Sequence, residues 1–174
     1  DLIFRNNGWF LLVTVDLPDG AKIPSSDFIG VDLGLANIAT DNTGKQYSGE
    51  VVEATRSHHL ERRSKLQQVA ALQKNRGKRP RSARRALRRI AGREARFRKD
   101  VNHCVSKELV AKAKGTECGI ALEDLKGIRK RTRFRKWQRA KISGWSFFQL
   151  RAFIEYKSKL SGVEVRIVEP KNTS

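Results

Sequence analysis

The stretch FIGVDLGLANIATDNTGKQYSGEVVE, residues 28–53, predicts the beginning of a β-sheet. A short apolar run leads to Asp32, a second strand follows, and the turn at residues 41–44 separates it from a third. A carboxylate at the end of so apolar a strand loses hydration and gains nothing in return unless a cation meets it, so we expect a cationic partner for Asp32. Gly30 and Gly34 lie on either side, and their missing side chains indicate that something approaches the backbone closely here.

Helices dominate the middle of the chain. Apolar residues at steps of three and four predict one helix from about Ser57, followed by a turn near residues 75–80. A second, long helix is expected from Ser82, a residue type that caps helices, to Gly115, a residue type that ends them. Both helices are rich in Arg and Lys.

Strands flank this helical region. An apolar strand is expected at residues 8–17, before the opening stretch, and a shorter one at residues 118–122, after the helices. The chain closes with a helix that ends at Gly162, with Ser143 or Ser146 as its N-cap, and with a last strand. Three consecutive strands followed by helices alternating with strands indicate an α/β fold, a mixed five-stranded sheet flanked by helices.

The chain carries a large excess of positive charge. Its formal net charge is +19 over 174 residues, and its isoelectric point is near 10.7. Residues 56–99 hold 17 Lys and Arg against two acids, and residues 126–141 hold nine and no acid. Runs this one-sided favour contact with a polyanion, nucleic acid before a membrane surface, through neutralisation of phosphates. A solvated basic face without a ligand is the alternative.

The residues expected to contact nucleic acid form two groups, one around the turn between the long helices and one in the loop that follows the short strand. They are Arg76, Lys78, Arg79, Arg81, Arg84, Arg85, Arg88, Arg89, Arg129, Lys130, Arg131, Arg133, Arg135, Lys136 and Trp137. Trp137 and Phe134 lie among nine basic residues, a mixture suited to stacking on unpaired bases. Packing on the sheet is the alternative for Trp137.

Cys104 and Cys118 lie among apolar residues without metal-site spacing, so we expect buried free thiols in a reducing cytosol. The sequence holds no apolar run of about 18 residues and no signal-peptide pattern. It has no Met and begins within strand-like sequence. We therefore expect part of a longer cytoplasmic protein.

Two of the predicted strands end in acids, Asp32 after FIGV and Glu123 after GIAL. If these strands are neighbours, about 4.8 Å apart, their carboxylates can share a divalent cation. Oxygen ligands suit Mg²⁺ or Mn²⁺, and two such ions about 4 Å apart clamp the attacking and leaving oxygens of a phosphodiester. Structural acids at strand ends are the alternative. The histidines His58, His59 and His103 have no visible catalytic partner, and a packing or capping role is favoured for His103.

Several motifs occur in an order that is similar to a known family. They are GVDLGLANIATDNTG, KDVNHCVSKELVAKA, IALEDLKGIR and WSFFQLRAFIEYKSKLSGVEVRIVEPKNTS. Together they resemble the OrfB/TnpB family of insertion-sequence transposons, compact relatives of the type V CRISPR effectors. The resemblance implies an RNase H-like, RuvC-like nuclease fold and an RNA-guided DNA endonuclease that uses Mg²⁺ and three acids. On that pattern Asp32 is the first catalytic, metal-binding acid and Glu123 the second.

The resemblance also implies domain limits. Residues 1–24 end a preceding barrel domain or lead into the nuclease, and residues 25–174 form the RuvC-like domain, with a basic helical hairpin at residues 56–115 inserted between strands three and four. In the family, a four-cysteine zinc ribbon and the third catalytic Asp follow the last strand. We therefore expect Zn²⁺ only in that missing ribbon. We expect this chain alone to bind metal weakly and to cleave negligibly, since Glu164 and Glu169 do not match the third position.

The partners implied by the resemblance are guide RNA and DNA, both single-stranded and as a guide–target duplex, in a prokaryotic cytoplasm near the nucleoid. Neither a membrane nor a small-molecule substrate is expected. One alternative is a nuclease-dead module that retains nucleic-acid binding, although both acids are present. A less favoured one is an actin-like or sugar-kinase-like phosphotransferase, since GVDLG also resembles the phosphate loop of those proteins. That reading needs a second lobe with an adenosine site, which the sequence does not offer.

Overall fold

The computed structural model describes residues 1–5, 7–34, 36–125 and 147–169. The strands are β1 (Leu2–Arg5), β2 (Gly8–Leu11), β3 (Phe28–Asp32), β4 (Asn37–Asp41), β5 (Gln46–Ser48), β6 (Gly119–Glu123) and β7 (Val165–Val168). The helices are α1 (Glu50–Asn75), α2 (Arg81–Ile90), α3 (Arg93–Gly115) and α6 (Phe147–Ser161). None of the helices described is long and apolar enough to cross a membrane.

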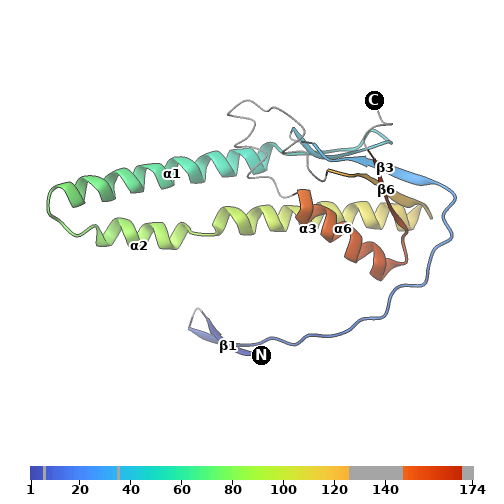
Figure 1. Cartoon of the computed structure of the whole chain (residues 1–174), viewed down its shortest axis with the longest axis horizontal. Coiled ribbons are helices and arrows are strands. Elements are labelled where there is room, and N and C mark those ends of the chain that lie inside the picture. The colour runs from blue at the N-terminus through green and yellow to red at the C-terminus, as the bar shows by residue number, and fades with distance from the viewer. Residues whose placement is uncertain (6, 35, 126–146, 170–174) are drawn as a thin grey trace.

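The predicted mixed five-stranded sheet is confirmed, and its strand order is β5-β4-β3-β6-β7. The first three strands form an antiparallel meander, whereas β6 runs parallel to both β3 and β7. A parallel pair needs a long crossover connection, and α1, α2 and α3 lie between β5 and β6 in the chain. The helices thus return the chain to the middle of the sheet, where β6 pairs with β3 (Figure 1).

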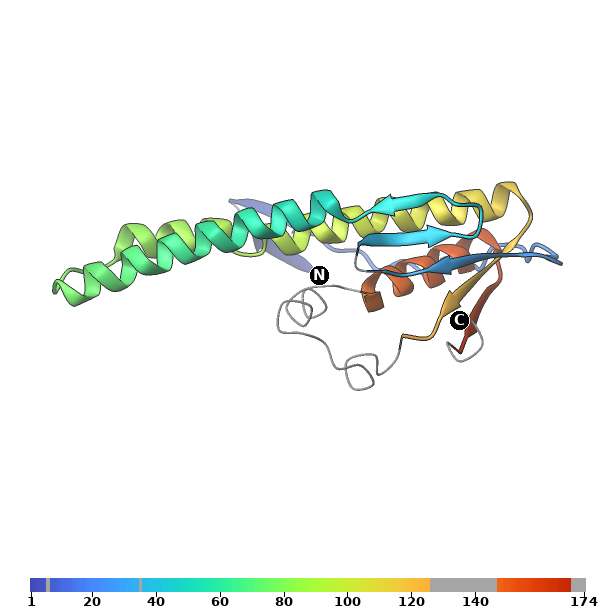
Figure 2. The ribbon, with the colours of Figure 1, turned by 90° about the horizontal axis from the view of Figure 1, so that it is seen from above.

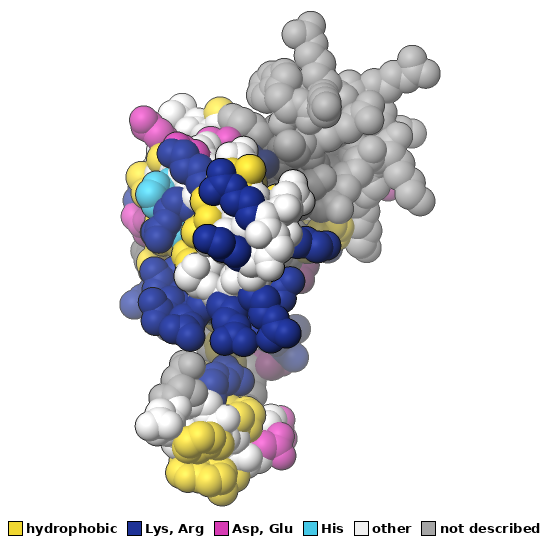
Figure 3. Space-filling model, turned by 90° about the vertical axis from the view of Figure 1, so that its left-hand side faces the viewer, with side chains coloured by type: hydrophobic (Ala, Val, Ile, Leu, Met, Phe, Trp, Pro, Cys, Tyr) yellow, Lys and Arg dark blue, Asp and Glu magenta, His cyan; other side chains and the backbone are white. Residues whose placement is uncertain are grey.

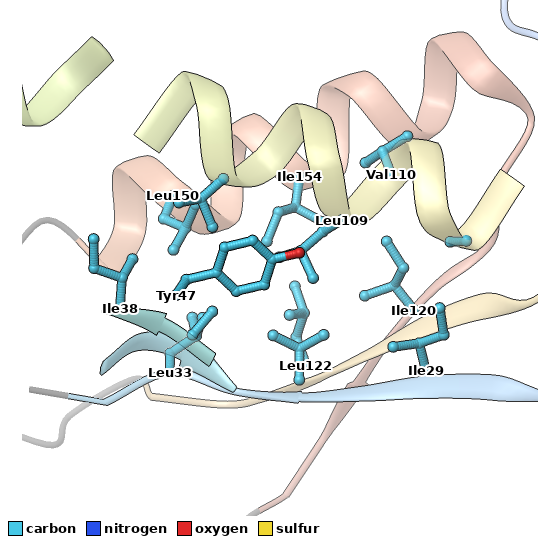
Figure 4. Close-up of a cluster of buried hydrophobic side chains, with 14 of the residues drawn as sticks. Ile29, Leu33, Ile38, Tyr47, Leu109, Val110, Ile120, Leu122, Leu150 and Ile154 are labelled. Carbon is cyan, nitrogen blue, oxygen red and sulfur yellow. The ribbon is translucent and has the colours of Figure 1, made fainter. Parts of the chain in front are cut away.

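One face of the sheet packs on α3 and α6, and this layer contains the hydrophobic core (Figure 4). Ile29 and Val31 of β3 and Leu122 of β6 point to this face and are buried, as are Leu109 of α3 and Ile154 of α6. Side chains alternate along a strand, so Gly30, between Ile29 and Val31, belongs to the opposite face. Each fully buried Leu or Ile contributes about 1.5–3 kcal/mol to folding, which holds the central strands in register.

Beyond the sheet, α1, α2 and the first half of α3 form a long helical arm that projects from the core (Figures 1 and 2). The first predicted helix exists but starts at Glu50 rather than Ser57. Its predicted apolar stripe is largely solvent-exposed, with Leu60 45% and Leu72 56% accessible, because the arm has little to pack against. The arm therefore offers its surface to solvent or to a ligand over most of its length.

The expected long second helix is wrong, because the chain forms α2 and α3 with a break at Gly92. Gly92 has φ = 73°, a left-handed conformation that glycine adopts without strain. Ser82 does not cap the helix; it lies within α2, and Pro80 occupies the N-cap position. Gly162, with φ = 75°, follows the end of α6 as predicted, whereas the cap candidates Ser143 and Ser146 lie outside the described residues.

At the N-terminus, β1 and β2 form a hairpin that lies apart from the five-stranded sheet (Figure 1). The expected strand at residues 8–17 is too long, since β2 ends at Leu11, which pairs with Leu2, the first residue of its antiparallel partner β1. The connection to β3 docks on the end of α6. The Gly20 N–H donates to the Lys159 carbonyl at 3.0 Å, and the Ile23 N–H donates to that of Gly162 at 2.9 Å.

Both cysteines are free thiols, but the expectation that they are buried is wrong. Cys104 is exposed and Cys118 is partly buried. On α3 the positions next to Cys104, namely Val105 and Ser106, turn toward the core instead. Cys104 therefore lies off the apolar face of α3, although apolar residues lie near it in the sequence.

A buried ion pair ties the sheet to α3. Asp41, at the end of β4, is 3% exposed, and its carboxylate accepts hydrogen bonds from the Lys112 ammonium and from the Thr43 side chain and backbone. The Lys45 N–H donates to the same carboxylate at 3.0 Å. Burial alone would raise the pKa of Asp41, but the hydrogen bonds from Lys112, Thr43 and Lys45 lower it from 3.8 to about 2.

Replacing Asp41 with Asn is expected to destabilise the fold by about 2 kcal/mol, because the Lys112 ammonium loses its buried partner. The pKa of Asp41 is lowered on folding, so its contribution is complete above pH 3.8 and is lost as the pH falls through about 2. Urea unfolding at neutral pH and at about pH 2 measures both effects. The difference between wild type and Asp41→Asn should shrink in acid, while the exposed Asp27→Asn control should change little at either pH. An equal difference at both pH values would contradict the assignment.

Candidate metal site and basic surface

The register of two parallel strands brings the predicted acids together. Val31 of β3 pairs with Leu122 of β6, and the same offset sets Asp32 beside Glu123 at the ends of these strands. Glu123 in turn pairs with Val168 of β7. The assumption made from the sequence, that the strands carrying the two acids are neighbours, is therefore confirmed.

The two carboxylates share a groove on the sheet face opposite α3 and α6. Its lining comes from the central strands β3, β4 and β6 and from the end of β7. The lining residues are Gly30, Val31, Asp32, Thr40, Asp41, Asn42, Ala121, Leu122, Glu123 and Val168. Asp32 is exposed and Glu123 partly buried, so both are accessible to a ligand in the groove.

The reason given for a cation near Asp32 needs correction. Asp32 is not dehydrated, because its side chain belongs to the open face of the sheet, and it forms no ion pair within the described part of the chain. The strand-end acid that is buried and met by a cation is Asp41, paired with Lys112. The sequence signal was misleading because residues 41–44 were interpreted only as a turn.

The ionisable side chains of the groove are carboxylates, and carboxylate oxygens fit a hard divalent cation such as Mg²⁺ or Mn²⁺ rather than zinc. No cluster of three or more acidic, histidine or cysteine side chains occurs among the described residues. The neighbouring acids are engaged elsewhere, since Asp124 pairs with Arg151 at 3.2 Å and Glu164 with Arg166 at 2.7 Å. The described chain thus offers two of the three ligands expected for the site.

The first group of predicted nucleic-acid contacts forms an exposed surface at the far end of the arm (Figure 3). All eight basic residues from Arg76 to Arg89 in this group are exposed, and none pairs with a described acid. A hollow at the turn between α1 and α2 is lined by Lys74, Lys78, Arg79, Arg81 and Arg84, with Gly77 and Pro80. Figure 3 shows Lys and Arg dominating this end of the molecule. The second group, Arg129 to Trp137, lies outside the described residues, as does Phe134.

His103 takes a packing position, the role favoured for it from the sequence. His103 stacks on Phe153 with ring centroids 3.9 Å apart, where α3 meets α6. Burial and the nearby ammonium of Lys157 lower the pKa of His103. The Lys157 ammonium also donates to the His103 carbonyl at 2.6 Å. His58 and His59 lie on α1, away from the acidic groove.

Sequence reasoning missed two residues that border the groove, Thr40 of β4 and Asn42 in the turn that follows it. Thr40 pairs with Asp32, and the Asn42 N–H donates to the Gly30 carbonyl at 2.9 Å. The available signal was the antiparallel meander itself, because it puts residues just before and after the turn next to the acid-bearing strand.

Comparison with known families identifies the chain. The model of the family OrfB_IS605, described as a probable transposase, matches residues 12–136. The chain belongs to this OrfB/TnpB family. The resemblance read from the sequence motifs is thereby confirmed.

Relatives and solved structures agree with this assignment. The TnpB-like protein MJ0751 of Methanocaldococcus jannaschii is 35% identical over 59% of this chain and 37% of its own length. The CRISPR-associated endodeoxyribonuclease Cas12f1 of Sulfoacidibacillus thermotolerans is 29% identical over 98% of this chain and 41% of its own length. This TnpB-family chain thus spans about two fifths of these curated relatives.

Two cryo-EM structures of Cas12f complexes share the fold. One is the Cas12f1–sgRNA–target DNA complex, with a TM-score of 0.61 over 90% of this chain and 31% of that chain. The other is a CRISPR–Cas12f ternary complex, with a TM-score of 0.62 over 94% of this chain and 33% of that chain. At 23% identity in both cases, the likeness concerns the fold, and it is consistent with the RuvC-like α/β architecture.

Metal binding by this TnpB-family chain is expected to be weak, because the groove offers two carboxylates and a third ligand is not among the described residues. Titration with Mn²⁺ followed by electron paramagnetic resonance should give a dissociation constant in the range of about 10⁻⁴–10⁻³ M. Glu123→Gln should abolish this binding, whereas Glu164→Gln, just before β7 and outside the groove, should leave it unchanged. Tight binding, or binding insensitive to Glu123→Gln, would contradict the two-ligand site.

Proposed function

We propose that this chain is the nuclease part of an RNA-guided DNA endonuclease that hydrolyses DNA phosphodiesters with Mg²⁺ or Mn²⁺. The observation that carries the proposal is the register of β3 and β6, which sets Asp32 and Glu123 side by side in one accessible groove. Membership of the OrfB/TnpB family and the name of the relative Cas12f1, an endodeoxyribonuclease, support it.

In this proposal Asp32 and Glu123 are the catalytic acids, and their carboxylate oxygens would hold the metal. When bound, the divalent metal ions polarise the phosphate and lower the pKa of a bound water, as in two-metal-ion hydrolysis. The protein residues fix where that chemistry occurs. The exposed Asp32 carboxylate defines the outer edge of the site, and Glu123, flanked by Val168, defines its other side. The third acid belongs to the longer protein, so the chain by itself is expected to be inactive.

The partners proposed are guide RNA and DNA, single-stranded and as the guide–target duplex. Two solved Cas12f structures of the same fold are titled as an sgRNA–target DNA complex and a ternary complex, which supports nucleic-acid partners by analogy. The basic end of the arm fits this role because exposed, unpaired Arg and Lys neutralise backbone phosphates without reading sequence.

The chain is also proposed to divide into two parts. Residues 1–24 are proposed to lead in from a preceding domain and residues 25–174 to belong to the RuvC-like nuclease. Residues 56–115 provide its basic hairpin. Zn²⁺ is proposed for a ribbon beyond this chain, and the prokaryotic cytoplasm, near the nucleoid, for its location.

A nuclease-dead nucleic-acid-binding module is the second candidate, and it is favoured because no cluster of three metal-ligating side chains occurs among the described residues. The kinase-like alternative finds no support, since the family match covers GVDLG together with the arm. The cleavage experiment separates the two remaining candidates.

Asp32→Asn in the intact protein, produced with its RNA, should lower Mg²⁺-dependent cleavage of labelled target DNA by about a thousandfold or more. The substitution removes a metal ligand that supports several kcal/mol of transition-state stabilisation, and each 1.36 kcal/mol is tenfold in rate. Asp27→Asn, at the exposed opposite end of β3, is the matched control and should cleave like wild type. Binding without cleavage in wild type would identify the binding module instead.

Neutralising the arm should weaken nucleic-acid binding in a salt-dependent way. Arg84 and Arg88 lie one helical turn apart on α2 and are exposed, so the double change to Gln removes up to two phosphate contacts. The slope of log K against log salt should then fall by up to about 1.8 for a duplex. Lys107 and Lys114 on α3, changed together to Gln, give the same charge loss and should leave the slope unchanged. Equal slopes for both double variants would contradict a specific role of the arm.

A further inference from the structure

Gly30 lies in the middle of β3, and the described fold gives no reason for a glycine there. A Cβ atom built on Gly30 would meet only the Asn42 Cβ among described atoms, at an ordinary 3.8 Å. Its φ also lies outside the left-handed region that favours glycine. Gly119 of β6 differs, since a Cβ there would lie 2.3 Å from the Phe28 ring. Glycine within a strand weakens it, so Gly30 lowers stability without a described packing requirement.

The residue beside Gly30 on the next strand is also small. Gly30 pairs with Ala121 of β6, and both lie on the open face of the sheet. They line the acidic groove, one two-residue step before Asp32 and Glu123. At Gly30 and Ala121 the floor of the groove therefore carries nothing larger than a methyl group.

Polar and cationic side chains border this floor. On one side the exposed Asn42 lies against Gly30, and its amide reaches toward the Phe28 carbonyl at 3.5 Å. On the other side Arg166 of β7 pairs with Ala121, and its guanidinium lies 4.2 Å from the centroid of the Phe28 ring. Hydrogen bonding to Glu164 at 2.7 Å holds that guanidinium further. Asn42 and Arg166 thus flank the pair Gly30–Ala121 on its two sides in the sheet.

We propose that this floor seats the sugar of the DNA nucleotide adjacent to the cleaved bond, with its phosphate between Asn42 and Arg166. The inference rests on the proposed nuclease function and adds the position of the substrate strand. Residues two apart on one face of a strand are separated by about 6.7 Å, the length of roughly one extended nucleotide. A phosphate at the two acids therefore places the neighbouring sugar over Gly30 and Ala121.

This arrangement explains why the floor is flat. A sugar ring presents an apolar face that packs on Gly30 and Ala121, and any larger side chain at position 30 would lift the strand away from Asp32. A displacement of about 1 Å at a reacting phosphate can reduce a rate about a hundredfold. Gly30 is accordingly a positioning residue that acts by leaving space.

The test uses the intact protein with its RNA and the variants Gly30→Ala and Gly30→Val. Three quantities are measured: the thermal unfolding temperature, the single-turnover rate of cleavage of labelled DNA with Mg²⁺, and the affinity for a short labelled single-stranded oligodeoxynucleotide without metal. We expect an unchanged or raised unfolding temperature, cleavage lowered about tenfold for Ala and about a hundredfold for Val, and weaker strand binding. Gly115→Ala and Gly115→Val are matched controls, since a Cβ there meets no described atom within 4 Å.

The outcomes separate this inference from the function on which it rests. Cleavage and strand binding that stay at the wild-type level in Gly30→Val would overturn the inference. An unfolding temperature that falls by several degrees in Gly30→Val but not in Gly115→Val would also overturn it, because a part of this chain would then fill the groove. If the wild-type protein does not cleave, the proposed function fails. The affinity for the single-stranded oligodeoxynucleotide then tests the inference by itself. Strand binding that is weaker in Gly30→Val than in Gly115→Val supports the proposed sugar position, and equal binding by the two variants overturns it.

Discussion

The parallel pairing of β3 with β6 is the contact on which the other features depend. It joins strands that are separated in the sequence by the whole helical arm, and it sets the acids that end them side by side. A parallel pair needs a crossover, and α1 to α3 supply it, with Leu109 of α3 packed in the core that Leu122 of β6 helps to form. The acidic groove and the basic arm are therefore two consequences of a single connection.

The sheet separates its charged groups by face. On the covered face, Asp41 and Lys112 compensate each other, and hydrogen bonds from the turn satisfy the rest of the carboxylate. On the open face, Asp32 and Glu123 lie together without a compensating cation among the described residues. Two carboxylates in such a position repel each other, and a divalent cation relieves the repulsion. Strand-end acids thus serve two purposes: Asp41 forms a structural ion pair on one face, and Asp32 with Glu123 forms a candidate metal site on the other.

The sequence was sufficient for the five-stranded sheet and for the acids that end two of its strands, because strand-end acids and apolar runs are local signals. It was insufficient where tertiary contacts decide. The burial of Asp41 depends on Lys112, a residue 71 positions away. The sequence of residues 41–44 indicates a turn and gives no sign of this distant partner. The exposure of Asp32 and of Cys104 depends on which face the helices cover. The break at Gly92 was missed because the apolar stripe continues across it, and periodicity does not report a change of helix axis.

The positive charge of the arm lowers its stability, and a bound nucleic acid would offset this effect. Residues 56–99 concentrate a net charge of +15 on helices that bury few side chains, and Leu60 and Leu72 remain exposed. Self-repulsion of this kind destabilises a compact state, and it is strongest at low salt, where screening is weakest. Binding of a nucleic acid is strongest under those same conditions. A phosphate backbone along the arm would therefore replace the repulsion by attraction. The stability of the folded arm and the binding of nucleic acid to it are then linked by mass action.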